Sequence, residues 1–235
     1  MRPDPVRAEI EALREKWKGQ PTSSLYRELS DLLFKTGKIT AAMNLMERSL
    51  KAVAAGGNGD TAESGPEEGA WWFRRGLEYA DASLFEEASL SLNRAIEAGC
   101  DNFESHYCLA GVYKSLDNIE AANRHCRKSL EYNPNFAPAN ILLGSIAKMD
   151  GRLDDAAIAA KKALLIDPNC APAHYDLACY YALSGETEKA LMAMEMALAK
   201  GFSDFEWASH DSDLESISSS QEFHLLLRTY AEKKG

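Results

Sequence analysis

Apolar residues recur every three or four positions through much of the chain, which is the spacing of one face of an α-helix. Ala137–Asp150 and Leu153–Ile166 show this spacing and are separated by a short segment that contains Gly151. Glycine readily adopts the left-handed conformation that ends a helix. The residue before a proline is biased away from helical geometry, so Pro168 is expected to stop the second segment. The pattern therefore predicts two amphipathic helices joined by a tight turn.

The same helix pair is repeated at intervals of 34 residues. The chain matches itself at this shift in four consecutive blocks, residues 69–102, 103–136, 137–170 and 171–204. Small residues recur in the eighth, twentieth and twenty-seventh positions of a block, as Gly76, Ala88 and Ala95 do in the first, and let two helices approach closely. Helix pairs on a fixed period stack into a superhelix with a concave face. The sequence therefore predicts an all-α protein, an α-solenoid of antiparallel helix pairs with helical caps.

The repeat resembles the tetratricopeptide repeat (TPR), whose signature is a Trp, Leu-Gly, Tyr, Ala, Phe, Ala, Pro series. The matching residues of the first block are Trp72, Gly76, Tyr79, Ala88 and Ala95, and those of the third are Leu143, Gly144, Ala156, Ala163 and Pro168. Arg75 departs from the pattern, since leucine usually precedes this glycine. The resemblance covers residues 69–204 and implies a right-handed superhelix that acts as a protein-interaction module.

The N-terminal flank is predicted to contain a capping helix and a weaker copy of the repeated helix pair. Residues 1–20 place Val6, Ile10, Leu13 and Trp17 on one helical face, which predicts a capping helix. Residues 21–53 fit a degenerate TPR-like helix pair. Residues 54–68 are rich in Gly, Ser and acidic residues, and we expect a flexible loop there. The degenerate pair then either docks on the main array or forms a separate lobe.

The C-terminal flank, residues 205–235, is predicted to be a helical cap. It is similar to the D-x-D/P-L…F-x-x-L-L tails that close bacterial arrays of this family. A terminal repeat exposes an apolar face that another element must cover. We expect Trp207, Leu214, Phe223 and Leu226 to cover it.

Composition narrows the function classes. The formal net charge is −10, which disfavours the phosphate neutralisation on which nucleic-acid binding depends. No stretch reaches the roughly 20 apolar residues of a membrane span, and the first residues lack the pattern of a secretory signal. The five cysteines include no C-x-x-C pair, which argues against a disulfide framework or a zinc site. These features predict a cytoplasmic protein without membrane insertion, metal or cofactor.

No catalytic constellation stands out. The chain has no G-x-S-x-G, phosphate-binding glycine loop or H-E-x-x-H motif. Cys126 follows His125, but neighbouring helical residues point about 100° apart, and Cys126 takes a packing position. His106 and His174 occupy a position of bulky packing residues, which predicts structural roles. We therefore expect no enzyme activity.

Binding is the favoured function. The TPR resemblance implies that the first helix of each pair lines the concave groove. Candidate groove residues at the matching positions are Phe73, Leu77, Tyr107, Lys114, Ile141, Ser145, Lys148, Tyr175 and Cys179. The positions with which some TPR proteins clamp a C-terminal carboxylate hold Phe73, Leu77, Cys108, Pro138 and Leu142 here, so that specialisation is rejected.

These observations predict a non-catalytic scaffold that binds a peptide or partner helix of another protein in the groove. The alternatives are a self-associating assembly unit that forms homo-oligomers and, less favoured, a regulatory subunit of an enzyme complex.

Overall fold

The computed structural model describes residues 28, 31–32 and 66–232. By its internal contacts the chain divides into two units, residues 1–65 and residues 66–235. In the first unit, Glu28, Asp31 and Leu32 are helical. The predicted capping helix of residues 1–20, most of the degenerate pair of residues 21–53 and residues 54–65 of the predicted loop lie outside the described residues. The second unit carries the repeats and is described by itself below.

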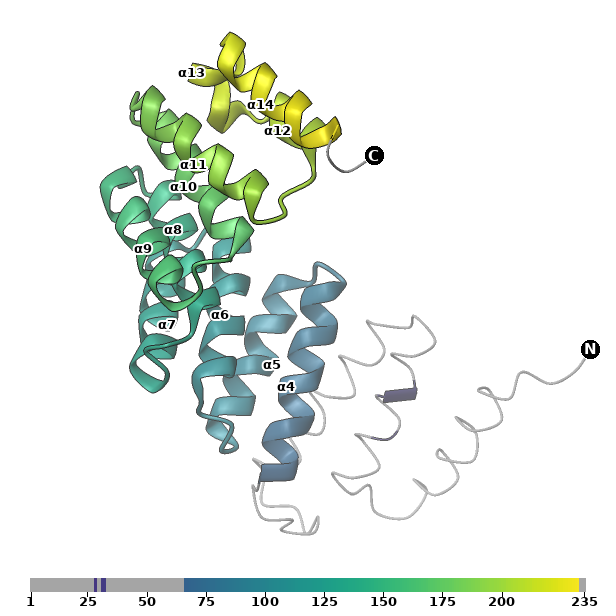
Figure 1. Cartoon of the computed structure of the whole chain (residues 1–235). Helices are drawn as coiled ribbons and strands as arrows, with labels where there is room; N and C mark the ends of the chain where they lie inside the picture. The colour runs from purple at the N-terminus through teal and green to yellow at the C-terminus, as the bar shows by residue number, and fades with distance from the viewer. Residues whose placement is uncertain (1–27, 29–30, 33–65, 233–235) are drawn as a thin grey trace, which may run out of the picture. The chain divides into compact units, whose positions relative to one another are not determined.

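Four helix pairs follow one another along the second unit (Figure 1). The first helix of each pair packs against the second, and successive pairs pack against each other. No strand occurs between residues 66 and 232, which confirms the predicted all-α class. The pairs are α4 (Pro66–Asp81) with α5 (Phe85–Glu97), α6 (Phe103–Ser115) with α7 (Ile119–Tyr132), α8 (Ala137–Met149) with α9 (Leu153–Ile166), and α10 (Ala171–Leu183) with α11 (Thr187–Ala199).

The turn inside each pair has the same backbone conformation at equivalent positions. Gly151 and Gly185 adopt φ angles of 71° and 74°, as the sequence pattern predicts. In the first two pairs, Ser83 and Asp117 adopt φ angles of 59° and 55°, although side chains rarely favour that region. The repeat therefore imposes its turn even where glycine is missing.

Glycine allows close helix contact at the eighth position of two repeats. A Cβ atom added at Gly76 would lie 2.5 Å from Cγ of Leu92, a fully buried side chain of α5. One added at Gly144 would lie 3.1 Å from the carbonyl oxygen of Ala156 on α9. Gly111 on α6 differs, because a Cβ atom there would meet nothing within 4 Å.

We expect alanine at these glycines to have opposite effects on stability. Alanine in a helix interior is favoured over glycine by about 0.5–1 kcal/mol, so Gly111→Ala should raise the free energy of unfolding by that amount. Gly76→Ala should lower it by about 1–2 kcal/mol, because overpacking costs about 1–3 kcal/mol and outweighs the helix gain. Urea unfolding followed by circular dichroism measures both, and a loss of stability in Gly111→Ala would contradict the assignment.

Helix α4 begins earlier than the sequence analysis placed it. The predicted loop ends at Glu68, whereas Pro66, Glu67 and Glu68 belong to α4. The correction has a local cause. Proline is tolerated in the first turn of a helix, and acidic side chains there interact favourably with the helix dipole. The composition that indicated a loop therefore also suits a helix start.

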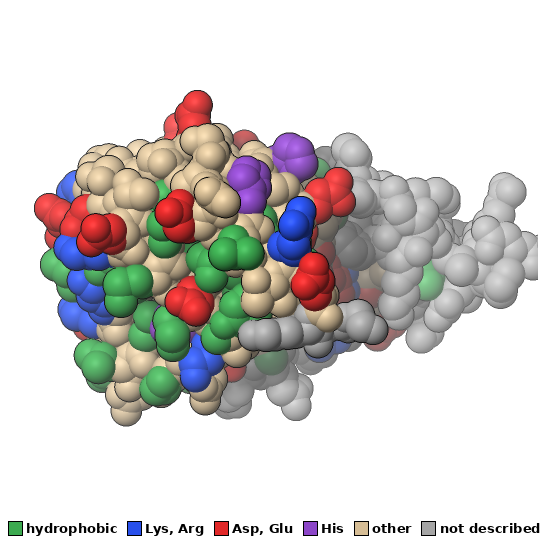
Figure 2. All heavy atoms as spheres, turned by 45° about the horizontal axis from the view of Figure 1, so that its top comes forward, with side chains coloured by type: hydrophobic (Ala, Val, Ile, Leu, Met, Phe, Trp, Pro, Cys, Tyr) green, Lys and Arg blue, Asp and Glu red, His purple; other side chains and the backbone are tan. Residues whose placement is uncertain are grey.

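The C-terminal cap covers the last helix pair. It consists of α12 (Phe205–His210), the 3-10 helix η1 (Ser212–Leu214), α13 (Glu215–Ser218) and α14 (Gln221–Glu232) (Figure 1). The last three pack on α10 and α11, and α12 packs on η1. Leu214 and Phe223 are fully buried, as predicted, and Leu226 packs against the same core. Ile217 is also fully buried. In the view of Figure 2, which brings this end forward, apolar side chains lie in small groups between charged ones.

Trp207 does not belong to this core, which corrects the prediction. Its side chain is 60% exposed, whereas Ala208, the next residue, is fully buried. Successive helical residues point about 100° apart. Helix α12 turns its alanine into the core, while the indole stays largely exposed and makes a side-chain hydrogen bond with Tyr175 of α10.

Candidate functional site

Helix α10 and the cap segment Asp211–Asp213 meet through polar contacts. The hydroxyl of Tyr175 donates a hydrogen bond of 2.6 Å to Oδ2 of Asp211, and the thiol of Cys179 donates to the same oxygen at 3.8 Å. The other carboxylate oxygen accepts the backbone N–H of Asp213 at 2.9 Å. The ring of Tyr175 stacks on Phe202, with centroids 4.3 Å apart. Each oxygen of Asp211 therefore has a defined donor.

Two lysines and a half-buried carboxylate complete this site. Lys148 of α8 forms an ion pair with Asp213. Burial raises the pKa of Asp176 on α10 to about 6, while the positive charges of Lys148 and Lys114 oppose the rise. Lys114 lies on α6, so α6, α8 and α10 present charged groups to one shared region. Asp176 was missed by sequence reasoning, although it is the one carboxylate in α10.

The structure brings together four of the predicted groove residues, Lys114, Lys148, Tyr175 and Cys179. Two of them are less exposed than residues of an open groove were expected to be. Tyr175 is 8% exposed and Cys179 is 4% exposed, because the chain's own cap covers them. The cap was predicted to act through Trp207, Leu214, Phe223 and Leu226, and no polar contact was included. The acidic pair of the D-x-D-L pattern was the available signal for this contact.

The other predicted groove residues lie earlier on the array. Ile141 and Ser145 of α8 are half-buried, and so is Tyr107 of α6. The ring of Tyr107 packs edge-on against Phe136, with centroids 5.1 Å apart. On α4, Phe73 is half-buried and Leu77 is 37% exposed. Their binding role stays a prediction.

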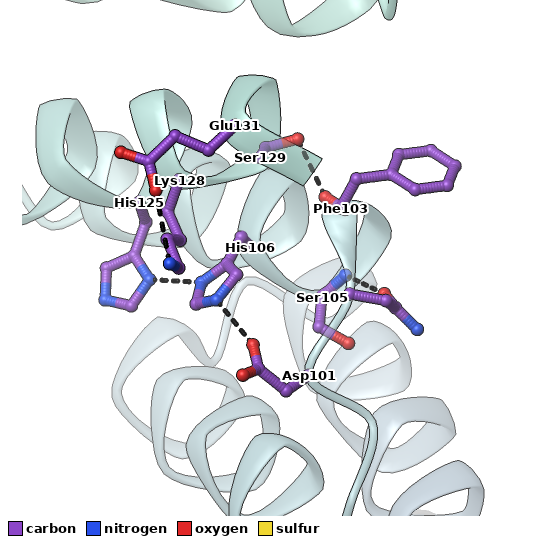
Figure 3. Close-up of polar contacts among 9 residues, drawn as sticks. Asp101, Phe103, Ser105, His106, His125, Lys128, Ser129 and Glu131 are labelled. Carbon is purple, nitrogen blue, oxygen red and sulfur yellow. Dashed lines mark hydrogen bonds and ion pairs between the residues drawn. The ribbon is translucent and has the colours of Figure 1, made fainter. Parts of the chain in front are cut away.

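A second polar cluster joins α6 to α7 (Figure 3). Nδ1 of His106 lies 2.9 Å from Nδ1 of His125, and Nε2 of His106 lies 2.9 Å from Oδ1 of Asp101. One of the two facing nitrogens must carry a proton that the other accepts, so the second histidine resists protonation. Burial, followed by the charges of His106 and Arg124, lowers the pKa of His125 to about 4.

This Asp-His-His chain lacks a nucleophile at its end. The thiol of Cys126 donates to the carbonyl oxygen of Ala139 at 3.0 Å, and burial raises its pKa to about 12. The hydroxyl of Ser129 donates to the carbonyl oxygen of Phe103 at 2.8 Å (Figure 3). The cluster is therefore explained as a structural link. Sequence reasoning placed His106 in a packing role but missed its pairing with His125, which lies on the other helix of the pair.

Three side chains of the cap contact could in principle hold a metal ion. Cys179, Asp211 and Asp213 each place one ligand atom within 4.8 Å of the others. Their atoms already have protein partners, because Asp211 accepts from Tyr175 and Asp213 pairs with Lys148. Burial, followed by Asp211, raises the pKa of Cys179, which keeps the thiol protonated. The contact is satisfied without an ion.

Within the part of the chain that the structure describes, no helix combines the length and apolar character needed to cross a membrane.

Comparison with solved structures identifies the fold. MamA is 23% identical, with a TM-score of 0.58 over 73% of this chain and 94% of MamA. YrrB, described as a TPR protein with an unusual peptide-binding site, is 22% identical, with a TM-score of 0.58 over 82% of this chain and 93% of YrrB. PilF of Pseudomonas aeruginosa is 18% identical, with a TM-score of 0.60 over 71% of this chain and 74% of PilF.

A search with family models and a search among curated proteins found no match to the sequence. The structural likeness, the helix pairs and the 34-residue period agree with one another. They confirm the predicted α-solenoid, and residues 66–232 of this chain form an array with the tetratricopeptide-repeat fold.

Proposed function

We propose that the chain is a non-catalytic scaffold whose concave face, formed by α4, α6, α8 and α10, binds a peptide or helix of another protein. One observation carries the proposal. The chain's own segment Asp211–Asp213 is bound to this face through Lys148, Tyr175 and Cys179. A surface that holds a short segment of its own chain by side-chain contacts has the chemistry to hold one from a partner.

The part of the face before this contact supplies the surface for a partner. Tyr107, Ile141 and Ser145 keep part of their side chains exposed there, and Lys114 adds a positive charge. YrrB shares the fold and is described as having a peptide-binding site, which supports the same use here. The proposal places the protein in the cytoplasm with a protein partner and assigns it no nucleic acid, membrane insertion or cofactor.

Gly111 offers a direct test, because it lies between Tyr107 and Lys114 on one face of α6. A side chain added there meets no atom of the fold within 4 Å, so it would fill the groove instead of the core. We expect Gly111→Trp to fold as the wild type does and to lose at least nine-tenths of the partner captured by cross-linking from the native lysate.

The matched control is Leu165→Trp, which adds the same ring at a position on α9 that is 83% exposed. Unchanged capture in this control, with loss in Gly111→Trp, supports the groove. Equal capture by the two variants would overturn it. Size-exclusion chromatography over a range of concentrations tests self-association, because only a homo-oligomer would shift with concentration. A shift that Gly111→Trp abolishes would make the partner a second copy of the chain.

A further inference from the structure

The segment that the cap places on α10 shows which chemistry this face recognises. Lys148 pairs with Asp213, while Tyr175 and Cys179 donate to Asp211 two residues earlier. The face therefore contacts two side chains of the cap segment, and these are separated by one residue. The first carboxylate meets hydroxyl and thiol donors, and the second meets an ammonium group.

The repeat places a related set of side chains one helix pair earlier. Subtracting the 34-residue period from Lys148, Tyr175 and Cys179 leads to Lys114, Ile141 and Ser145. The lysine is kept, and serine replaces cysteine as a small donor. Isoleucine replaces the tyrosine that donates to Asp211, so the equivalent position has an apolar surface in place of a hydroxyl.

This earlier set differs from the later one in being uncovered by the cap. Ile141, Ser145 and Lys114 all keep some solvent exposure, whereas Tyr175 and Cys179 are buried. Among residues 66–232, no hydrogen bond or ion pair reaches the ammonium group of Lys114, whose only such contact outside the helix ladder is the carbonyl oxygen that accepts the N–H of Asp117. The charge of Lys114 lowers the pKa of Asp176 on α10, but the two side chains do not form an ion pair. Gly111, one turn before Lys114, leaves open space beside it.

We propose that Lys114, Ile141 and Ser145 form a second segment-binding subsite, which takes a segment of the form apolar-x-Asp from a partner protein. The aspartate would pair with Lys114 as Asp213 pairs with Lys148. The apolar side chain would pack on Ile141, in the place that corresponds to Asp211. The inference rests on the proposed function and adds the chemical class of the partner segment.

Two synthetic peptides test it on the full chain. The first has the sequence of residues 209–218 with Asp211→Leu, and the second has Asp213→Asn in addition. Fluorescence anisotropy is measured at 0.15 M salt, where the repulsion of the acidic chain is screened beyond about 8 Å. Titration to about 1 mM protein detects a dissociation constant as high as about 1 mM. We expect saturable binding of the first peptide and at least tenfold weaker binding of the second.

Protein variants locate the peptide. Lys114→Met should weaken binding of the first peptide at least tenfold, whereas Lys162→Met, which removes an exposed positive charge from α9, should leave it within twofold. Circular dichroism melts establish that both variants are folded. Absence of saturable binding, or binding that Lys114→Met leaves unchanged, would overturn the inference. If the first peptide does not bind but Gly111→Trp still abolishes partner capture, the proposed groove function is supported and the apolar-x-Asp specificity is wrong.

Discussion

Replacing Phe223 with alanine is expected to lower the free energy of unfolding by about 3–5 kcal/mol, the usual cost of emptying a buried aromatic site. The ring is fully buried in the core that joins α14 to the last repeat. Leu214 and Ile217 share that core and come from separate short helices of the cap. A cavity there weakens several contacts at once, because α13 is only 4 residues long and η1 only 3.

Leu225→Ala is the matched control, since Leu225 lies on the same helix and is 62% exposed. An exposed substitution of this kind changes stability by about 0.5 kcal/mol or less. Urea unfolding monitored by circular dichroism compares the two variants with the wild type. Similar stability losses in both would show that α14 does not seal the array.

The repeat architecture could be predicted from the sequence because the residues required for close helix packing recur with the 34-residue period. Gly76 and Gly144 had to be small where the structure brings α5 or α9 close, and Gly151 had to turn the chain. These constraints act within one repeat and are copied along the chain. They can therefore be detected without knowing any distant contact.

The contacts that the sequence did not predict join residues outside that periodicity. Tyr175 and Asp211 are separated by 36 residues and belong to a repeat and to the cap, so no shared period relates them. Trp207 was expected in the core because it is large and apolar, but in a helix of 6 residues its side chain is 60% exposed and contacts the hydroxyl of Tyr175 at the edge of the array. The apolar face of so short a helix is not defined by its sequence alone.

The partial filling of the groove follows from the same physics. A terminal repeat leaves polar groups and apolar surface that the chain must cover, and the cap covers both. Asp211 accepts the hydrogen bonds of Tyr175 and Cys179, Asp213 pairs with Lys148, and Leu214 and Phe223 fill the core. The last repeat thus has a structural use for its concave side. We propose that the earlier repeats keep their concave side for a partner.

Asp176→Asn is expected to raise the free energy of unfolding at pH 7.5 by about 2 kcal/mol. Burial raises the pKa of Asp176 to about 6, above its ordinary value of 3.8. The folded protein therefore bears a carboxylate that ionises more readily once the chain unfolds. Each pKa unit corresponds to about 1.4 kcal/mol, and some of that is discounted because the amide must also be buried. Glu195→Gln, at an exposed position of α11, controls for the loss of one negative charge.

The pH dependence separates this carboxylate from His125. A raised pKa contributes stability below pH 3.8 that is lost as the pH rises through about 6, so the advantage of Asp176→Asn should vanish near pH 4. The pKa of His125 is lowered from 6.5 to about 4, and its contribution is present above pH 6.5 and lost as the pH falls toward 4. The effects of the two groups on the free energy of unfolding therefore offset each other in the wild type.

Unfolding free energies measured at pH 7.5 and 4.5 should fall more steeply on acidification in Asp176→Asn than in the wild type. An equal slope in both proteins would show that Asp176 ionises normally, and that the ammonium groups of Lys114 and Lys148 fully compensate its burial.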